Sequence, residues 1–126
     1  IGNIERLILA TLGHKEVSRF CAAVQAKSSY SINEEQLTIL NKGLCCVVTG
    51  KKRSEQTINS VYRSNSIILD PNTALCVGGL QDYRAQSGAS RTTIVLADAS
   101  PLSYIDEVER ATGVSKNKIP ELITRI

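Results

Sequence analysis

The stretch Ile67-Ile68-Leu69-Asp70-Pro71-Asn72-Thr73-Ala74 decides how this chain is expected to fold. It joins an apolar, β-branched run to a helix start, because Asp70 is a good N-cap and Pro71 suits the first helical position. A second junction of this kind follows, where residues 92–96 lead through Asp98 and the N-cap Ser100 into Pro101. Strand-to-helix junctions are where α/β proteins place ligands, so both junctions mark the edge of a candidate site.

Residues 44–49, Leu-Cys-Cys-Val-Val-Thr, form a continuous apolar run that predicts a buried strand. With residues 92–96 and the short run 67–69, this segment predicts an α/β fold. We expect a partial parallel sheet flanked by helices, in which residues 44–49 and 92–96 pair. Two strands and a short third are too few for a self-sufficient sheet. The sequence therefore favours a slice of a larger α/β domain, the alternative being a small helical domain.

Helical spacing of apolar residues covers most of the remaining chain. The expected helix starts are Asn3, the region before Val17, a capping box Ser31-x-x-Glu34, Ser54, Pro71, Pro101 and Pro120. The helix from Pro71 contains Gly78-Gly79, and each glycine weakens a helix by about 1 kcal/mol relative to alanine. This pair predicts close packing at that point.

Composition excludes several classes of protein. The 126 residues carry a net charge of +3, which is too balanced for a nucleic-acid or membrane surface. The sequence has no apolar run of transmembrane length and no signal peptide. It also has no methionine and begins at Ile1. We therefore treat residues 1–126 as a single fragment of a longer protein.

The four cysteines are not expected to bind metal or form disulfides. Cys45 and Cys46 are adjacent and would point to opposite faces of a strand, while Cys21 and Cys76 lie in helix-like segments. No Cys-x-x-Cys spacing occurs, and the single histidine, His14, lies at a polar turn. This usage predicts buried, reduced cysteines in a cytoplasmic protein and no metal site.

Three segments resemble the C-terminal part of threonine synthase, a pyridoxal-phosphate (PLP) enzyme of fold type II. That family typically has Ser-Asn-x-x-Arg where residues 2–6 read Gly-Asn-Ile-Glu-Arg. It has Leu-Asp-Pro-His-Thr-Ala at residues 69–74 and Thr-Ala-Ser/His-Pro at residues 98–101. A helix cap and an exposed arginine explain Asn3 and Arg6 equally well.

The resemblance implies a parent lyase that converts O-phosphohomoserine and water to threonine and phosphate. That chemistry needs a Schiff-base lysine, a phosphate-binding loop and a partner for the pyridine nitrogen. In the family, the lysine and the loop lie upstream of the matched region. The lysines here have polar neighbours, and they are Lys15, Lys27, Lys42, Lys51, Lys52, Lys116 and Lys118.

We therefore expect no catalytic residue in this fragment, no activity of the fragment alone and no PLP bound to it. The implied partners are the N-terminal remainder of the parent chain and, in the parent, a small-molecule substrate. A different class remains open, namely a non-catalytic α/β interaction or regulatory domain. The sequence upstream of Ile1 would distinguish the two, because only the enzyme needs a lysine-bearing PLP domain there.

Asp98 is the one candidate cofactor-binding residue. In the family, a threonine hydroxyl at the end of the last strand contacts the pyridine nitrogen, and the resemblance places Asp98 there. A carboxylate favours a protonated ring and a stronger electron sink. The alternative is that Asp98 only caps the helix from Pro101. Two further departures from the pattern are Asn72, in place of histidine, and Ser103, in place of lysine.

Overall fold

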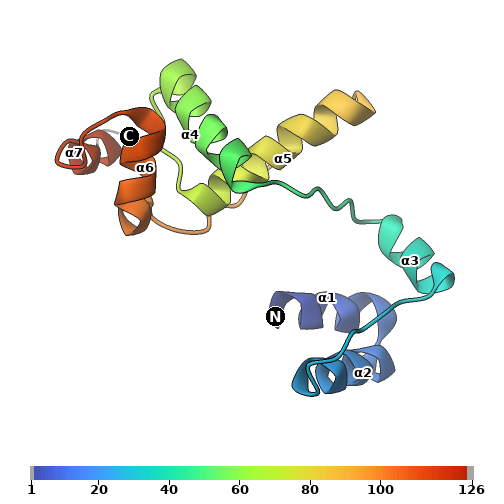
Figure 1. The fold of residues 1–126 in the computed structure, drawn as a ribbon. Helices are drawn as coiled ribbons and strands as arrows, with labels where there is room; N and C mark the ends of the chain where they lie inside the picture. The colour runs from blue at the N-terminus through green and yellow to red at the C-terminus, as the bar shows by residue number, and fades with distance from the viewer. Residues whose placement is uncertain (1, 125–126) are drawn as a thin grey trace. The chain divides into compact units, whose positions relative to one another are not determined.

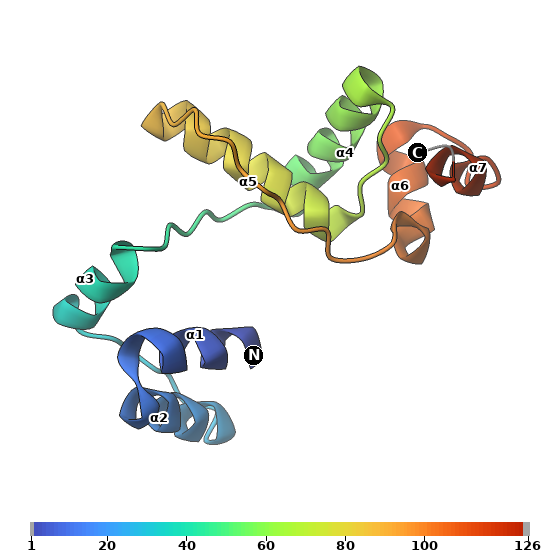
Figure 2. The ribbon, with the colours of Figure 1, turned by 180° about the vertical axis from the view of Figure 1, so that it is seen from behind.

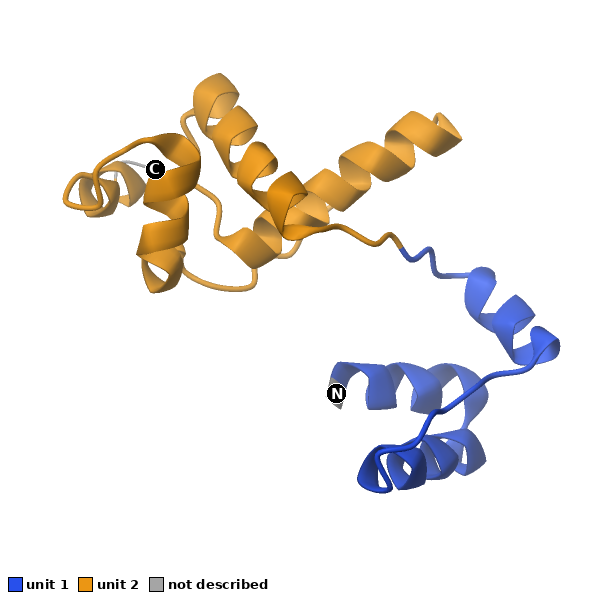
Figure 3. Ribbon diagram, in the orientation of Figure 1, with its two compact units in different colours: residues 1–46 blue, residues 47–126 orange. Residues whose placement is uncertain are grey.

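The computed structural model describes residues 2–124 and forms two compact units, Ile1–Cys46 and Val47–Ile126 (Figures 1 and 3). Within the described residues the chain is helical and contains no β-strand. The elements are α1 (Gly2–Leu12), α2 (His14–Gln25), α3 (Glu34–Asn41), α4 (Lys51–Asn65), α5 (Pro71–Ser87), the 3-10 helix η1 (Pro101–Tyr104), α6 (Ile105–Thr112) and α7 (Ile119–Ile123).

In the first unit, α1 contacts both α2 and α3. Gly13 separates α1 from α2 with a φ of 87°, a left-handed conformation that suits glycine. The expected capping box is displaced by two residues. Asn33, not Ser31, caps α3, since its side chain accepts from the Gln36 amide while the Gln36 side chain accepts from the Asn33 amide.

In the second unit, the glycine pair of α5 packs against α4 at Gly78 and against the segment before α4 at Gly79. A Cβ on Gly78 would lie 2.8 Å from Oγ1 of Thr57, and one on Gly79 would lie 3.1 Å from Oγ1 of Thr49. Thr57 is fully buried, and its hydroxyl donates to the Arg53 carbonyl. The close packing predicted from Gly78-Gly79 is thus confirmed.

A small apolar core lies on the other side of α4. Ile68, Val108 and Ile119 are buried together, with Tyr62 and Leu122 packed against them. Hydrogen bonds from two polar side chains of α4 fix this arrangement. Its Ser54 hydroxyl donates to the Pro71 carbonyl over 2.8 Å, and its Asn59 amide donates to the Ala111 carbonyl over 2.6 Å. Ser54 therefore lies inside α4, which begins at Lys51, and does not start the helix as expected.

The predicted parallel sheet is wrong. Residues 44–49 and 92–96 are outside helices, but they make no strand ladder with each other or with residues 67–69. After α5 the chain turns back and runs along that helix (Figure 2), where the Arg84 side chain donates to the Arg91 carbonyl over 2.7 Å. A strand needs a hydrogen-bonded neighbour, and α5 offers side chains but no free backbone groups.

The side chains of these segments are correspondingly exposed. Val48 is 98%, Ile94 86% and Leu96 81% exposed. The prediction that the cysteines are buried is also wrong. Cys45, Cys46 and Cys76 are exposed and Cys21 is half-buried, all four with free thiols. No helix of the described residues is long and apolar enough to cross a membrane.

We expect Gly78→Ala to lower the free energy of unfolding of the second unit by about 1–3 kcal/mol. The added methyl collides with a buried threonine whose hydroxyl is already bonded, and this outweighs the gain of roughly 1 kcal/mol in helix propensity. Thermal unfolding followed by circular dichroism measures the effect. Gly43→Ala, whose Cβ meets nothing within 4 Å, is the control. An unchanged midpoint for Gly78→Ala would contradict the packing described above.

Candidate functional site

The site is built on the first turn of α5, which Asp70 caps. Its Oδ1 accepts from the backbone amides of Asn72 at 2.9 Å and Thr73 at 3.1 Å. Its Oδ2 accepts from the Thr73 hydroxyl. Asp70 is only 2% exposed, so these bonds form out of contact with water. The N-cap and the Pro71 start predicted from the sequence are confirmed.

The electrostatics of this cap keep Asp70 ionised. Burial raises the pKa of its carboxyl, but the hydrogen bonds from the Thr73 hydroxyl and from the amides of Thr73, Asn72 and Ala99 together outweigh burial. The pKa of Asp70 therefore lies below its ordinary value. The positive end of the α5 dipole acts in the same direction.

Asp98 lies against this capped turn. Its backbone amide donates to the Thr73 hydroxyl oxygen at 3.1 Å, and its carboxylate oxygen Oδ2 accepts from the Asn72 side-chain amide at 2.7 Å. The side chain of Asp98 is exposed. Two adjacent residues of α5 thus hold both the backbone and the side chain of Asp98.

Capping of the following helix is done by a different residue. The Ser100 hydroxyl accepts from the Leu102 amide at 3.3 Å, at the start of η1. Asp98 makes no hydrogen bond to η1 within the described residues; its carboxylate contacts Asn72 instead. The N-cap predicted at Ser100 is confirmed, and the alternative role of Asp98 as that cap is not observed.

Tyr104 completes the cluster, and the sequence gave no signal for it. Its hydroxyl accepts from the Asn72 side-chain amide at 3.3 Å, so both hydrogens of that amide have acceptors. The Asn72–Asp98 contact was missed as well, because it joins residues 26 apart in sequence. The only sequence clue was that both positions depart from the same family pattern.

The hydrogen-bond acceptor of this cluster, the Asp98 carboxylate, suits a protonated ring nitrogen. One oxygen of the Asp98 carboxylate is bonded to Asn72, and the other, Oδ1, accepts no hydrogen bond from the described residues. An exposed carboxylate with an open oxygen can accept from a ring N–H. Asp98, held by Asn72, therefore fits the pyridine end of PLP.

Nothing in the described residues suits the aldehyde end of PLP. All seven lysines are exposed, whereas an amine poised for covalent attachment is usually desolvated. For Lys116, the hydrogen bond to Asp106 raises the pKa, which is the opposite of what nucleophilic attachment requires.

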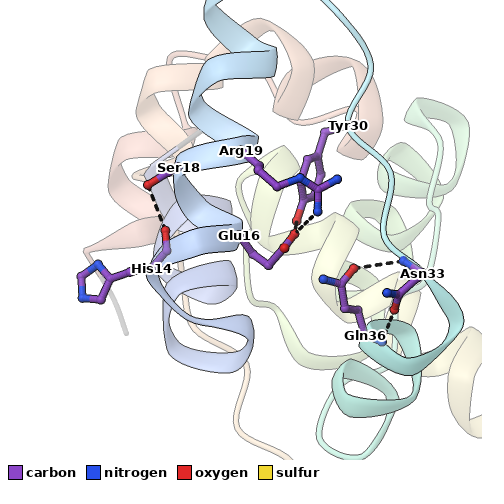
Figure 4. A network of polar contacts seen from close by, with 7 residues as sticks. All are labelled: His14, Glu16, Ser18, Arg19, Tyr30, Asn33 and Gln36. Atoms are coloured by element: carbon purple, nitrogen blue, oxygen red, sulfur yellow. Dashed lines mark hydrogen bonds and ion pairs between the residues drawn. The ribbon is translucent and has the colours of Figure 1, made fainter.

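The first unit holds a separate polar cluster around Glu16 (Figure 4). This nearly buried carboxylate accepts from Arg19 at 2.7 Å and from the Tyr30 hydroxyl at 3.0 Å. The hydrogen bond from Arg19 lowers the pKa of Glu16. Tyr30 also packs edge-on against Phe20, with ring centroids 5.3 Å apart. The cluster ties the segment after α2 back onto that helix, and its paired charges indicate a structural role.

Other sites in the described residues are weaker. An open depression of about 650 Å³ beside the core is lined by Tyr62, Gly113, Val114, Ser115, Lys118, Glu121 and Leu122. No cluster of histidine, cysteine, aspartate or glutamate able to hold a metal is present in residues 2–124. Asn3 and Arg6 are exposed, and the Arg6 side chain donates to the Asn3 side chain at 3.3 Å. Asn3 lies inside α1, which begins at Gly2, so it does not start the helix as expected.

Comparison with known proteins identifies one kind of relative. The chain is 29% identical over 111 residues to threonine synthase of Pseudomonas aeruginosa, covering 86% of this chain and 23% of that protein. It superposes with a TM-score of 0.71 and 26% identity on PLP-bound threonine synthase from Brucella melitensis, covering 97% of this chain and 27% of that chain. No protein-family model matches. The chain thus spans about a quarter of the length of these relatives.

We expect Asp70→Asn to lower the stability of the second unit at pH 7 by about 1–2 kcal/mol, because an amide nitrogen cannot accept from the Thr73 hydroxyl. Since the pKa of Asp70 is lower in the folded state, its contribution is complete above the unfolded value of 3.8 and disappears as the pH falls through the folded pKa.

Thermal unfolding measured between pH 2 and pH 7 tests this prediction. The loss of stability below pH 4 should be smaller in Asp70→Asn than in the unmodified chain. Asp106→Asn, which changes an exposed carboxylate, is the matched control. Parallel stability curves for Asp70→Asn and the unmodified chain would exclude a dominant role of this carboxylate.

Proposed function

We propose that this chain, which resembles the C-terminal part of threonine synthase, serves as the corresponding part of a PLP-dependent lyase acting in the cytoplasm. The proposed reaction converts O-phosphohomoserine and water to threonine and phosphate. The similarity to two threonine synthases supports the proposal, and one of them is described as PLP-bound. The observation that carries it is the superposition on the PLP-bound threonine synthase, which has a TM-score of 0.71 and covers 97% of this chain.

In this proposal, the bound cofactor supplies an electron-withdrawing ring for the chemistry at the substrate carbon. The part of this chain is to bind and orient that ring. Asp98 would hold the ring nitrogen, because its carboxylate can accept a hydrogen bond and its negative charge would favour the protonated ring. The Thr73 hydroxyl fixes the Asp98 backbone, and buried Asp70 fixes that hydroxyl.

The remaining machinery has to come from the rest of the parent chain. The lysines of this fragment are exposed, and none offers a covalent attachment site. We therefore assign the anchoring lysine and the phosphate-binding loop to the N-terminal remainder, and we expect the fragment alone to be inactive and free of PLP. The small-molecule substrate binds where the two parts meet.

In this proposal, the surface that receives the remainder is formed, within the second unit, by residues 47–49 and 92–96. They are extended, apolar and without strand partners among the described residues. Val47 lies near Gly79 and Thr93 bonds to Arg84, so α5 already backs both segments. Apolar side chains of the remainder would cover Val48, Ile94 and Leu96.

In the full-length protein, we expect Asp98→Asn to reduce turnover about 100-fold while changing stability by less than about 0.5 kcal/mol. The amide keeps the shape of the side chain and an acceptor for Asn72, but it lacks the charge that holds the ring proton. Phosphate release from O-phosphohomoserine measures turnover, with Asp106→Asn as control. Equal turnover of Asp98→Asn and the unmodified protein would refute the role of Asp98.

The surface is tested with Ile94→Lys in two settings. In the 126-residue chain Ile94 is 86% exposed, so the substitution should change the unfolding midpoint very little. In the full-length protein the lysine would be buried unpaired, which should cost about 3 kcal/mol or more. Leu102→Lys, at another exposed apolar residue, serves as control. Equal, small effects of Ile94→Lys in both settings would show that residues 92–96 stay uncovered.

A further inference from the structure

Two departures from the threonine synthase pattern touch each other in this structure. The resemblance described above implies a histidine at position 72 and a threonine at position 98, where this chain has Asn72 and Asp98. The Asn72 amide nitrogen lies 2.7 Å from Oδ2 of Asp98, although 26 residues separate the two in sequence. The third departure, Ser103, lies in η1 and has no side-chain hydrogen bond to this pair.

The geometry of the amide leaves it little freedom. One Asn72 amide hydrogen is directed to Asp98 and the other to the Tyr104 hydroxyl, at 3.3 Å. The Asp98 backbone is fixed independently through the Thr73 hydroxyl. Asp98 is therefore held through its Oδ2 and through its backbone amide. Among the described residues, nothing bonds to its Oδ1, which stays open to a ligand.

The chemistry explains why an amide suits a carboxylate here. A histidine beside Asp98 would be drawn to its protonated form, because a neighbouring negative charge stabilises imidazolium. That cation would compete with a protonated ring nitrogen for the same carboxylate. Asparagine donates a hydrogen bond but cannot take up a proton, so the charge of Asp98 stays available for the ligand.

We propose that Asn72 is the positioning residue of Asp98 and that the two replace, as one coupled unit, the histidine and threonine of the threonine synthase pattern. This inference rests on the proposed function, because it assigns the open oxygen of Asp98 to the cofactor ring. The pair would then favour the protonated form of the cofactor ring. Asn72 suits a carboxylate at position 98, and Asp98 suits a donor at position 72 that cannot take up a proton.

A double-mutant cycle in the full-length protein tests the coupling, using Asn72→His, Asp98→Thr and both together. We expect each single variant to lower turnover at least tenfold and to shift the visible absorbance maximum of bound PLP. The double variant should retain at least about fivefold more turnover than the product of the single effects predicts. Ser103→Lys, which restores the uncoupled third departure, should show no such interaction with Asp98→Thr.

A second measurement needs no cofactor. In nuclear magnetic resonance spectra of the 126-residue chain, Asp98→Thr should shift the side-chain amide signals of Asn72, and Ser103→Lys should leave them unchanged. The proposal would be overturned if Asp98→Thr left the Asn72 signals unshifted. It would also be overturned if the turnover of the double variant equalled the product of the two single effects. If the unmodified full-length protein binds no PLP, the proposed function fails and this role fails with it. In that case, a shifted Asn72 signal would show that the Asn72–Asp98 contact is present and contributes to stability alone.

Discussion

One buried carboxylate, that of Asp70, organises the part of the molecule to which function is assigned. It closes the first turn of α5 and fixes the Thr73 hydroxyl, whose oxygen in turn receives the Asp98 amide. Without an ionised acceptor at this position, two backbone amides and one hydroxyl would be buried without partners. The return of the chain along α5 therefore depends on a group that contacts no ligand itself.

Local sequence rules predicted this half of the structure well because the interactions are local. The Asp70-Pro71 start, the Ser100 cap and the packing at Gly78-Gly79 each depend on a few neighbouring residues or on one close helix contact. The capping box of α3 shows the limit of such rules. Ser31-x-x-Glu34 and Asn33-x-x-Gln36 both satisfy the pattern, and only the fold selects Asn33.

The predicted sheet failed for a physical reason that no local rule contains. Residues 92–96 have the composition of a strand and are extended, but a strand forms only where another backbone offers donors and acceptors. The candidate site followed the same division. Asp98 was found through the family pattern, whereas its contact with Asn72 and the place of Tyr104 required the folded chain.

The bare extended segments also have a consequence for the chain as a physical object. Val48, Ile94 and Leu96 combine high exposure with β-branched or aliphatic side chains and an unpaired backbone, which is the signature of sequences that nucleate cross-β association. Residues 92–97 contain no charge, and the flanking Arg91 and Asp98 are the charged residues that oppose such association. In isolation the chain should self-associate as its concentration rises. Its lifetime as a monomer in solution would depend on how soon these exposed segments are covered.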